Sequence, residues 1–196
     1  MVNGAPDRAA RIIAFLNTRD VDLGGDALAT REGLHAWLRE ERGYQGPPPS
    51  LRQMGAASRL REALRELLAR HGAAEAAPAV PADALNAWLA KFPVRFAAAP
   101  DGAFEVLPPG SDIVQALAGI AADAVLCQGS PAWLRIKVCQ NPDCRWAYYD
   151  RSHSATQKWC SMAGCGNRLK ARRHRRRKAL ASGRVMPPDS EAPAEN

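Results

Sequence analysis

The sequence predicts a mostly helical α+β protein, in which a helical N-terminal domain with one β-hairpin precedes a small cysteine-rich module that ends in a basic helix. Apolar residues recur at helical spacing through the first two thirds of the 196-residue chain, where a single stretch alternates as paired strands do. Four of the five cysteines lie in two close pairs between residues 139 and 165. An arginine-rich run of good helix formers follows them.

Three amphipathic helices are expected in the first 72 residues. The first spans 6–17, the second follows a capping Thr30 and ends at Gly43, and the third follows a capping Ser50 and stops near Gly72. Their inward-facing residues are Ile12, Ile13, Phe15 and Leu16; Leu34, Trp37 and Leu38; and Leu60, Leu64, Leu67 and Leu68. We expect these side chains to form the core of the N-terminal domain.

The segment RDVDLGGD between the first two helices contains three aspartates, which suggests a calcium-binding loop. That interpretation fails on spacing. If Asp20 were the first ligand, the twelfth position would be Arg31, where a calcium loop needs a bidentate glutamate. A polar turn is therefore the better prediction for this segment.

The rest of the N-terminal domain follows an Ala/Pro-rich connector at 73–83. One helix after the connector would carry Leu85, Trp88, Leu89 and Phe92 on one face, and residues 94–106 are expected to form a β-hairpin. The last helix would begin at a capping Ser111 and end at Gly129. Its predicted inward residues are Ile113, Leu117, Ile120, Ala124 and Val125. Cys127 stands outside the cysteine pairs and is expected to be a buried thiol.

The paired cysteines have the spacing Cys139-x4-Cys144-x15-Cys160-x4-Cys165. Two local pairs can supply the tetrahedron of thiolates that zinc prefers, and a reducing compartment disfavours a disulfide framework. His153 could replace one thiolate, but the four cysteines already complete the coordination number. The spacing therefore predicts one structural Zn²⁺ without an open position for a reacting water.

Four thiolates on one zinc ion carry a net negative charge that nearby cations should offset. The basic residues that flank the ligands are Lys137, Arg145, Lys158 and Arg168. The aromatic residues of the module are Trp146, Tyr148, Tyr149 and Trp159. We interpret these aromatic side chains as a miniature core, with stacking on nucleic-acid bases as the alternative.

Positive charge is concentrated in the cysteine-rich module and the helix after it. Residues 135–184 carry 14 Lys and Arg against 2 Asp and Glu, whereas residues 1–134 carry 13 against 15. Because the basic stretch lacks a large apolar face, the excess indicates a nucleic-acid partner rather than a membrane. The alternative is a passive solvated tail, which the absence of interspersed acidic residues disfavours.

A helix is expected over 166–181, with cations around nearly its whole circumference. Most arginine contacts in complexes go to phosphate, and an asparagine can pair with adenine. The predicted nucleic-acid-binding residues are Asn167, Arg168, Lys170, Arg172, Arg173, Arg175, Arg176, Arg177 and Lys178.

Two sets of residues resemble known families. The segments CQNPDCRWAYYDRS and WCSMAGCGNR resemble the CGNR zinc-finger family of bacterial proteins, and FLNTRDV with DALATREGLHAWL is similar to the ABATE domain that accompanies this finger. The resemblance implies zinc on the four paired cysteines, DNA contacts by the finger that include Asn167 and Arg168, and a place in stress-induced transcription regulation. It also indicates a shared structural or ligand-binding feature at Asn17, Thr18 and Arg19.

These observations predict three parts: a helical ABATE-like domain at 1–131, a treble-clef-like CGNR-type zinc module with an arginine-rich helix at 132–184, and a disordered acidic tail at 185–196. The expected function is DNA binding in transcription regulation. The N-terminal domain would sense a small-molecule effector or form a homodimer.

Two alternative functions stay open at the level of sequence. One is an RNA-binding or ribosome-associated protein, since a basic helix suits A-form backbone as well as duplex DNA. The other is an enzyme with an N-terminal site and the finger as its nucleic-acid anchor. The sequence contains no Ser/His/Asp set, phosphate loop or paired carboxylates with a clear role, so we expect no enzymatic activity. Without a long apolar run or a secretory signal, we expect a cytoplasmic protein and no membrane association.

Overall fold

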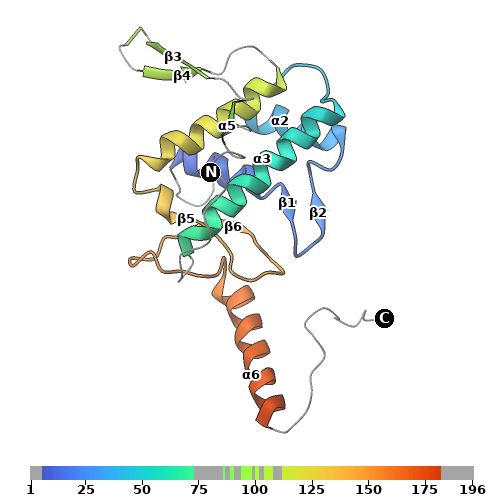
Figure 1. Ribbon diagram of the computed structural model, residues 1–196, viewed down its shortest axis with the longest axis vertical. Coiled ribbons are helices and arrows are strands. Elements are labelled where there is room, and N and C mark those ends of the chain that lie inside the picture. Colours follow the sequence, from blue (N-terminus) through green and yellow to red (C-terminus); the bar gives the residue numbers. More distant parts are fainter. Residues whose placement is uncertain are drawn as a thin grey trace. The chain divides into compact units, whose positions relative to one another are not determined.

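A computed structural model describes residues 6–72, 86, 89–90, 94–98, 100–101, 104–107 and 112–181 (Figure 1). The predicted connector at 73–83, most of the helix predicted after it and the acidic tail at 185–196 lie outside the described residues. The fold class is confirmed: helices predominate, the strands form small hairpins, and the four paired cysteines gather in the C-terminal region.

Four of the helices that the structure describes form the body of the N-terminal part. They are α1 (Asp7–Leu16), α2 (Arg31–Arg42), α3 (Leu51–Ala69) and α5 (Ile113–Gln128). Helix α1 packs against both α5 and α3, and the apolar stripes expected from the sequence meet in one core. Phe15 and Leu38 are fully buried there, and the ring centroids of Phe15 and Trp37 lie 5.3 Å apart. Burial of such side chains supplies most of the stability of the body.

Capping residues set the helix boundaries largely where the sequence places them. The Thr30 side chain accepts a hydrogen bond from the N–H of Gly33, and Ser50 forms a reciprocal capping box with Gln53. Gly43 ends α2 with φ 62°, a left-handed conformation that glycine adopts without strain.

Two predictions about α5 are wrong. Its capping residue is Asp112 and not Ser111: the Asp112 carboxylate accepts the N–H of Gln115, three residues further on. The side chain of Val125 is 58% exposed, although it was expected inside. Ala124 and Cys127 already occupy the buried face there, and a helix turns about 100° per residue, so Val125 points away from the core. Cys127 itself is buried, as expected.

The predicted hairpin consists of β3 (Arg95–Ala98) and β4 (Phe104–Leu107), which pair antiparallel from Arg95 opposite Leu107. The polar segment after α1 forms a second, shorter hairpin of β1 (Arg19–Asp20) and β2 (Gly25–Asp26). In its turn, Asp20 Oδ1 accepts the N–H groups of Asp22 and Leu23, and Gly24 has φ 73°. These hydrogen bonds support the polar-turn interpretation over a calcium loop.

A third hairpin begins the cysteine-rich region. The short 3₁₀ helix η2 (Trp133–Arg135) leads into β5 (Ile136–Val138), which pairs with β6 (Ala147–Tyr149). Strand β5 packs on α3 and β6 packs on α1, and both strands contribute buried residues to the core. This half of the cysteine-rich region is therefore built onto the helical body.

Backbone contacts divide the chain into two compact units, Met1–Cys160 and Ser161–Asn196. The first contains the helical body, the hairpins and three of the paired cysteines. The second contains a five-residue π-helix, η3 (Met162–Gly166), followed directly by α6 (Asn167–Ala181). The predicted boundary at 131/132 stays a prediction. Among the helices that the structure describes, none is long and apolar enough to cross a membrane.

Candidate metal centre

The first cysteine pair lies where the β5–β6 hairpin opens. The Cys139 N–H donates to the carbonyl of Trp146 at 2.9 Å, which extends the strand pairing by one residue, and the Cys144 N–H closes a turn onto Asn141 O at 3.0 Å. Arg145 follows with φ 50°, a left-handed conformation unusual for a residue with a side chain. The turn that begins at Asn141 thus folds the loop back so that both cysteine side chains lie on the same side.

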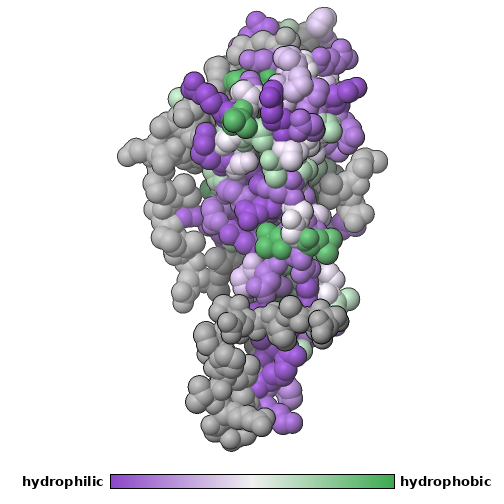
Figure 2. All heavy atoms as spheres, turned by 90° about the vertical axis from the view of Figure 1, so that its right-hand side faces the viewer, coloured by the Kyte–Doolittle hydropathy of each residue, from purple (hydrophilic) through white to green (hydrophobic). Residues whose placement is uncertain are grey.

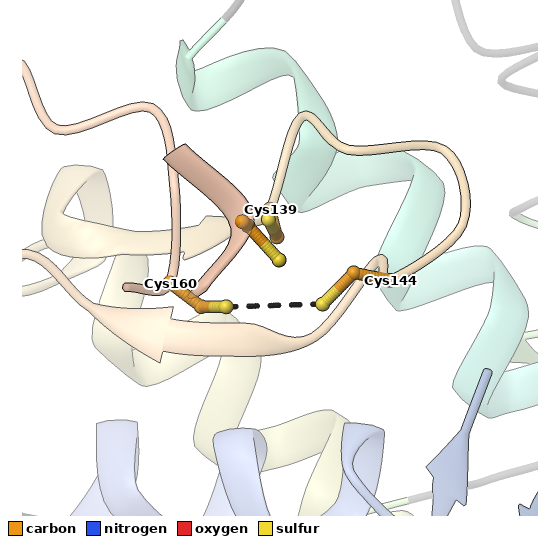
Figure 3. A group of neighbouring side chains, drawn as sticks. Cys139, Cys144 and Cys160 are labelled. Atoms are coloured by element: carbon orange, nitrogen blue, oxygen red, sulfur yellow. Dashed lines mark hydrogen bonds between the residues drawn. The ribbon is translucent and has the colours of Figure 1, made fainter. Parts of the chain in front are cut away.

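Cys160, the third cysteine, lies at the end of a segment that is hydrogen-bonded to the β5–β6 hairpin and its loop. Gln140 N–H donates to the carbonyl of Lys158 at 3.0 Å, and the Tyr148 hydroxyl donates to the carbonyl of Gln157 at 2.7 Å. Figure 3 shows the result: the side chains of Cys139, Cys144 and Cys160 converge, with the sulfurs of Cys144 and Cys160 facing each other.

The fourth cysteine lies in η3. The Ser161 side chain accepts the N–H of Gly164 at 3.2 Å, and the Ser161 carbonyl accepts the N–H of Gly166 at 3.0 Å, so the loop closes on itself. Cys165 is only 2% exposed, and Arg168 Nη2 donates to its sulfur at 3.3 Å. A wide π turn just before α6 therefore presents the thiol.

The arrangement of the sulfurs fits zinc. The four Sγ atoms all lie within 4.8 Å of one another, and those of Cys144 and Cys160 are 3.7 Å apart. A tetrahedral site with Zn–S bonds of about 2.3 Å has sulfurs about 3.8 Å apart. The set is Cys139, Cys144, Cys160 and Cys165, as predicted, and it holds one structural zinc ion. When bound, the ion cross-links the loops that carry these ligands.

His153 lies in an exposed turn and is not part of the metal-binding group found among the described residues. All four coordination positions are filled by thiolates, so the site is of the closed, structural type.

The cations near the ligands have different partners than the sequence suggests. Lys137 is buried and donates to Asp150 Oδ2 at 2.7 Å and to the carbonyl of Ala155. The Arg145 guanidinium pairs with Glu66. Arg168 donates a hydrogen bond to a ligand sulfur. The predicted charge compensation is thus seen at Arg168, whereas Lys137 and Arg145 are engaged by carboxylates.

The Lys137–Asp150 pair organises the segment between the two cysteine pairs. Burial opposes ionisation of Asp150, but hydrogen bonds from Lys137, Ser152 and Gln157 outweigh it and lower the pKa of this carboxyl to about 2. Burial also raises the pKa of the Tyr148 phenol, with a further rise from the negative charges of Asp150 and of Cys139 and Cys160. Tyr148 is 8% exposed, which supports its interpretation as part of a miniature core.

Residues that the sequence could not assign attach this region to the helical body. Arg65, which is 1% exposed, donates from Nη1 to the carbonyl of Arg145 at 2.7 Å and from Nη2 to the carbonyl of Leu16. The Asn17 amide donates to the carbonyl of Ala147 at 2.9 Å and accepts its N–H at 2.8 Å. The one available signal was the placement of arginines beside the leucine stripe of α3, at positions that helical spacing turns toward the core.

The resemblance indicated Asn17, Thr18 and Arg19 as a shared structural or ligand-binding feature. Thr18 Oγ1 donates to the carbonyl of Phe15 at 2.7 Å and accepts from Arg61 at 3.1 Å, and Arg19 lies 3.7 Å from Glu62. Together with the bonds of Asn17, these contacts support the structural alternative. Ligand binding by these residues stays a prediction.

The predicted nucleic-acid contacts all lie on α6. Asn167, Arg168, Lys170, Arg175, Arg177 and Lys178 are exposed and Arg172 is partly buried. The helix contains eight Lys and Arg residues and no acidic one. In the space-filling view of Figure 2, the described residues of α6 are strongly hydrophilic. A cationic helix of this kind can neutralise phosphates along a polyanion.

Two comparisons with known families match most of the chain. Residues 9–129, more than half of the protein, match the ABATE family model, described as "Putative stress-induced transcription regulator". Residues 135–178 match the CGNR zinc finger, a span that contains the four cysteines and the predicted nucleic-acid contacts. Both resemblances, and their order along the chain, are thereby confirmed. No curated protein matches the sequence.

Proposed function

Because the chain belongs to the ABATE family and carries a CGNR zinc finger, we propose that it is a transcription regulator that binds duplex DNA through α6. The observation that carries the proposal is the charge of this helix, eight cations without an acidic residue, beginning two residues after a zinc ligand. A helix fixed at one end by a closed zinc site can be held against a phosphate backbone at little cost in chain entropy. The zinc would have no catalytic part, and the reduced thiolates suit a cytoplasmic location.

A four-residue variant tests DNA binding by α6. Changing Arg172, Arg173, Arg175 and Arg176 to Ala should weaken binding to duplex DNA at least a hundredfold at low salt, because each phosphate contact contributes to counterion release. The matched control removes four exposed arginines of the first unit, Arg39, Arg52, Arg59 and Arg95. Fluorescence anisotropy with labelled duplex measures both affinities. Equal affinities for the two variants would contradict the proposal.

Competition decides between DNA and RNA as partners. At equal salt, unlabelled duplex DNA should displace the labelled duplex at lower concentration than a structured RNA does. Stronger competition by RNA would contradict DNA as the preferred partner and would indicate an RNA-binding protein.

The N-terminal domain is proposed to receive the regulatory signal. A hollow of about 620 Å³ beside α1 and α5 supports an effector role. Arg8 and Arg11, which both lie near the Asp123 carboxylate, line it together with Tyr149 and the apolar Leu126. Thermal-shift measurements with small organic acids test the proposal on the wild type and on Arg8→Gln, with Arg39→Gln as control. A stabilisation that Arg8→Gln retains in full would argue against this hollow as the site. Sedimentation analysis of the full chain tests the other proposed role, homodimer formation.

A further inference from the structure

The residues that follow the last zinc ligand turn back toward the loop that carries it. Arg168 lies one helical turn after Cys165, and its Nη2 donates to the Cys165 sulfur at 3.3 Å. Asn167 Nδ2 donates to the carbonyl of Ala163, four residues earlier, at 3.3 Å. Both polar side chains therefore form hydrogen bonds with residues of η3, although the sequence predicts that they contact nucleic acid.

The need for a cation at this sulfur follows from the charge of the site. Four thiolates around one Zn²⁺ leave a net charge of about −2, and Cys165 is almost completely buried. A charge-assisted hydrogen bond from a guanidinium draws electron density from the sulfur and fixes its direction. Such partners of metal ligands commonly change the metal affinity by about ten- to hundredfold.

Two other cations close to the ligands have oxygen partners in the structure. Lys137 donates to Asp150, Ala155 and Gln157, and the Arg145 side chain pairs with Glu66. Lys170, the next cation on α6, is exposed two residues beyond Arg168, so helical geometry turns it about 200° away around the axis. The hydrogen bond to the Cys165 sulfur therefore depends on the position of Arg168 on the helix.

We propose that Arg168 is a positioning residue of the zinc centre, and that its guanidinium pairs with the Cys165 thiolate and does not contact phosphate. Its partner Asn167 closes the same loop. The nucleic-acid-binding face of α6 then begins at Lys170. The second part of this proposal rests on the proposed function, whereas the first part concerns zinc alone and is tested without nucleic acid.

Zinc affinity of the full chain tests the first part, by competition with a chromophoric chelator. Arg168→Met keeps the length and helix propensity of the side chain but removes the donor, and should lower the affinity about ten- to hundredfold. Arg168→Lys keeps the charge without the planar guanidinium, so its zinc affinity should lie between that of Arg168→Met and that of the wild type. Lys170→Met removes the same charge two residues away and should bind zinc like the wild type. Equal zinc affinities for Arg168→Met and Lys170→Met would overturn the proposal.

A spectroscopic signature separates loss of the hydrogen bond from a general loss of fold. In Co²⁺-substituted protein, a hydrogen bond to a thiolate lowers the energy of its sulfur electrons, so its removal should shift the sulfur-to-cobalt charge-transfer band to longer wavelength. The shift is expected in Arg168→Met at full metal occupancy and absent in Lys170→Met. An unshifted band in Arg168→Met would count against the contact.

The salt dependence of DNA binding at saturating zinc tests the second part. Lys170→Met should reduce the magnitude of the slope of log affinity against log salt by about 0.9, the value for one phosphate contact, and Arg168→Met should leave it unchanged. A slope reduced equally by Arg168→Met would show that this residue contacts phosphate. If the wild type itself shows no salt dependence, the proposed function fails, while the zinc measurements still decide the role of Arg168.

Discussion

Arg65 shows how a single buried side chain connects distant parts of the chain. It is 1% exposed and donates to the carbonyls of Leu16 and Arg145 and to the carboxylate of Glu62. Burial lowers the pKa of its guanidinium, and the neighbouring charges of Arg61 and Arg145 lower it further, against the attraction of Glu62. Its two hydrogen bonds to main-chain carbonyls join the end of α1 to the loop of the first cysteine pair.

Replacing Arg65 should destabilise the protein strongly. Arg65→Met leaves two carbonyls without their donor, so we expect a loss of about 3 kcal/mol in the free energy of unfolding, measured by urea denaturation of the zinc-loaded protein. Arg52→Met, at an exposed position of the same helix, is the control and should change it by less than about 0.5 kcal/mol. A similar small effect for both variants would show that the contacts of Arg65 are energetically neutral.

Asp150 should make the free energy of unfolding depend on pH in the acidic range. Its pKa is lowered to about 2 in the folded state, below its value in the unfolded chain of about 3.9. Its contribution of about 2–3 kcal/mol is therefore fully present above the unfolded pKa and is lost as the pH falls through the folded pKa.

The measurement compares the wild type with Asp150→Asn. The wild type should be more stable by at least this amount at neutral pH, where the variant leaves Lys137 buried without a counter-charge. The difference in unfolding free energy should shrink between about pH 4 and pH 2. A difference that stays constant over this range would contradict the assignment.

At the scale of elements, the sequence predicts regular helices well and the special turns poorly. Side-chain caps at Thr30 and Ser50 lie at the expected positions, because the cap and its acceptor are neighbours in the sequence. The π-helix at Met162–Gly166 could not be expected, since its wide turn depends on where Cys165 must place its sulfur. The cap of α5 was misplaced by one residue because Ser111 and Asp112 are both good capping residues.

The cap of α5 can be tested directly. Asp112→Ala removes the acceptor of the Gln115 N–H and should cost about 1 kcal/mol of stability. The change Ser111→Ala should cost much less, since the carboxylate of Asp112 stays in place. Thermal unfolding of both variants measures the difference in stability. A larger loss for Ser111→Ala would indicate that Ser111 is the capping residue.

On the scale of the whole molecule, the metal ligands were predictable and their surroundings were not. Four cysteines in two close pairs specify a zinc site by spacing alone. The partners of that site come from far along the chain: Asn17 meets Ala147, and Arg65 meets Arg145. A single-sequence pattern can turn Arg65 toward the core, but it does not say which distant residue the side chain meets. The sequence patterns also do not show that β5 and β6 share the core of the helical body.

Removing zinc should affect the two compact units differently. Helix α6 is highly cationic and has little apolar surface, so its own propensity is insufficient to keep it helical without an anchor. Treatment with a chelator should reduce the helical circular dichroism signal while the body keeps a cooperative thermal transition. Hydrogen exchange should locate the loss in α6. Unchanged protection of α6 after zinc removal would contradict this view.

The salt dependence of DNA affinity tests most directly the claim that the zinc centre presents α6 to a phosphate backbone. If about six cations of the zinc-loaded protein contact phosphates of a duplex, the logarithm of affinity should fall with the logarithm of salt concentration at a slope of about −5. A slope near zero would mean that these cations do not contact phosphates, and would contradict DNA binding by this helix.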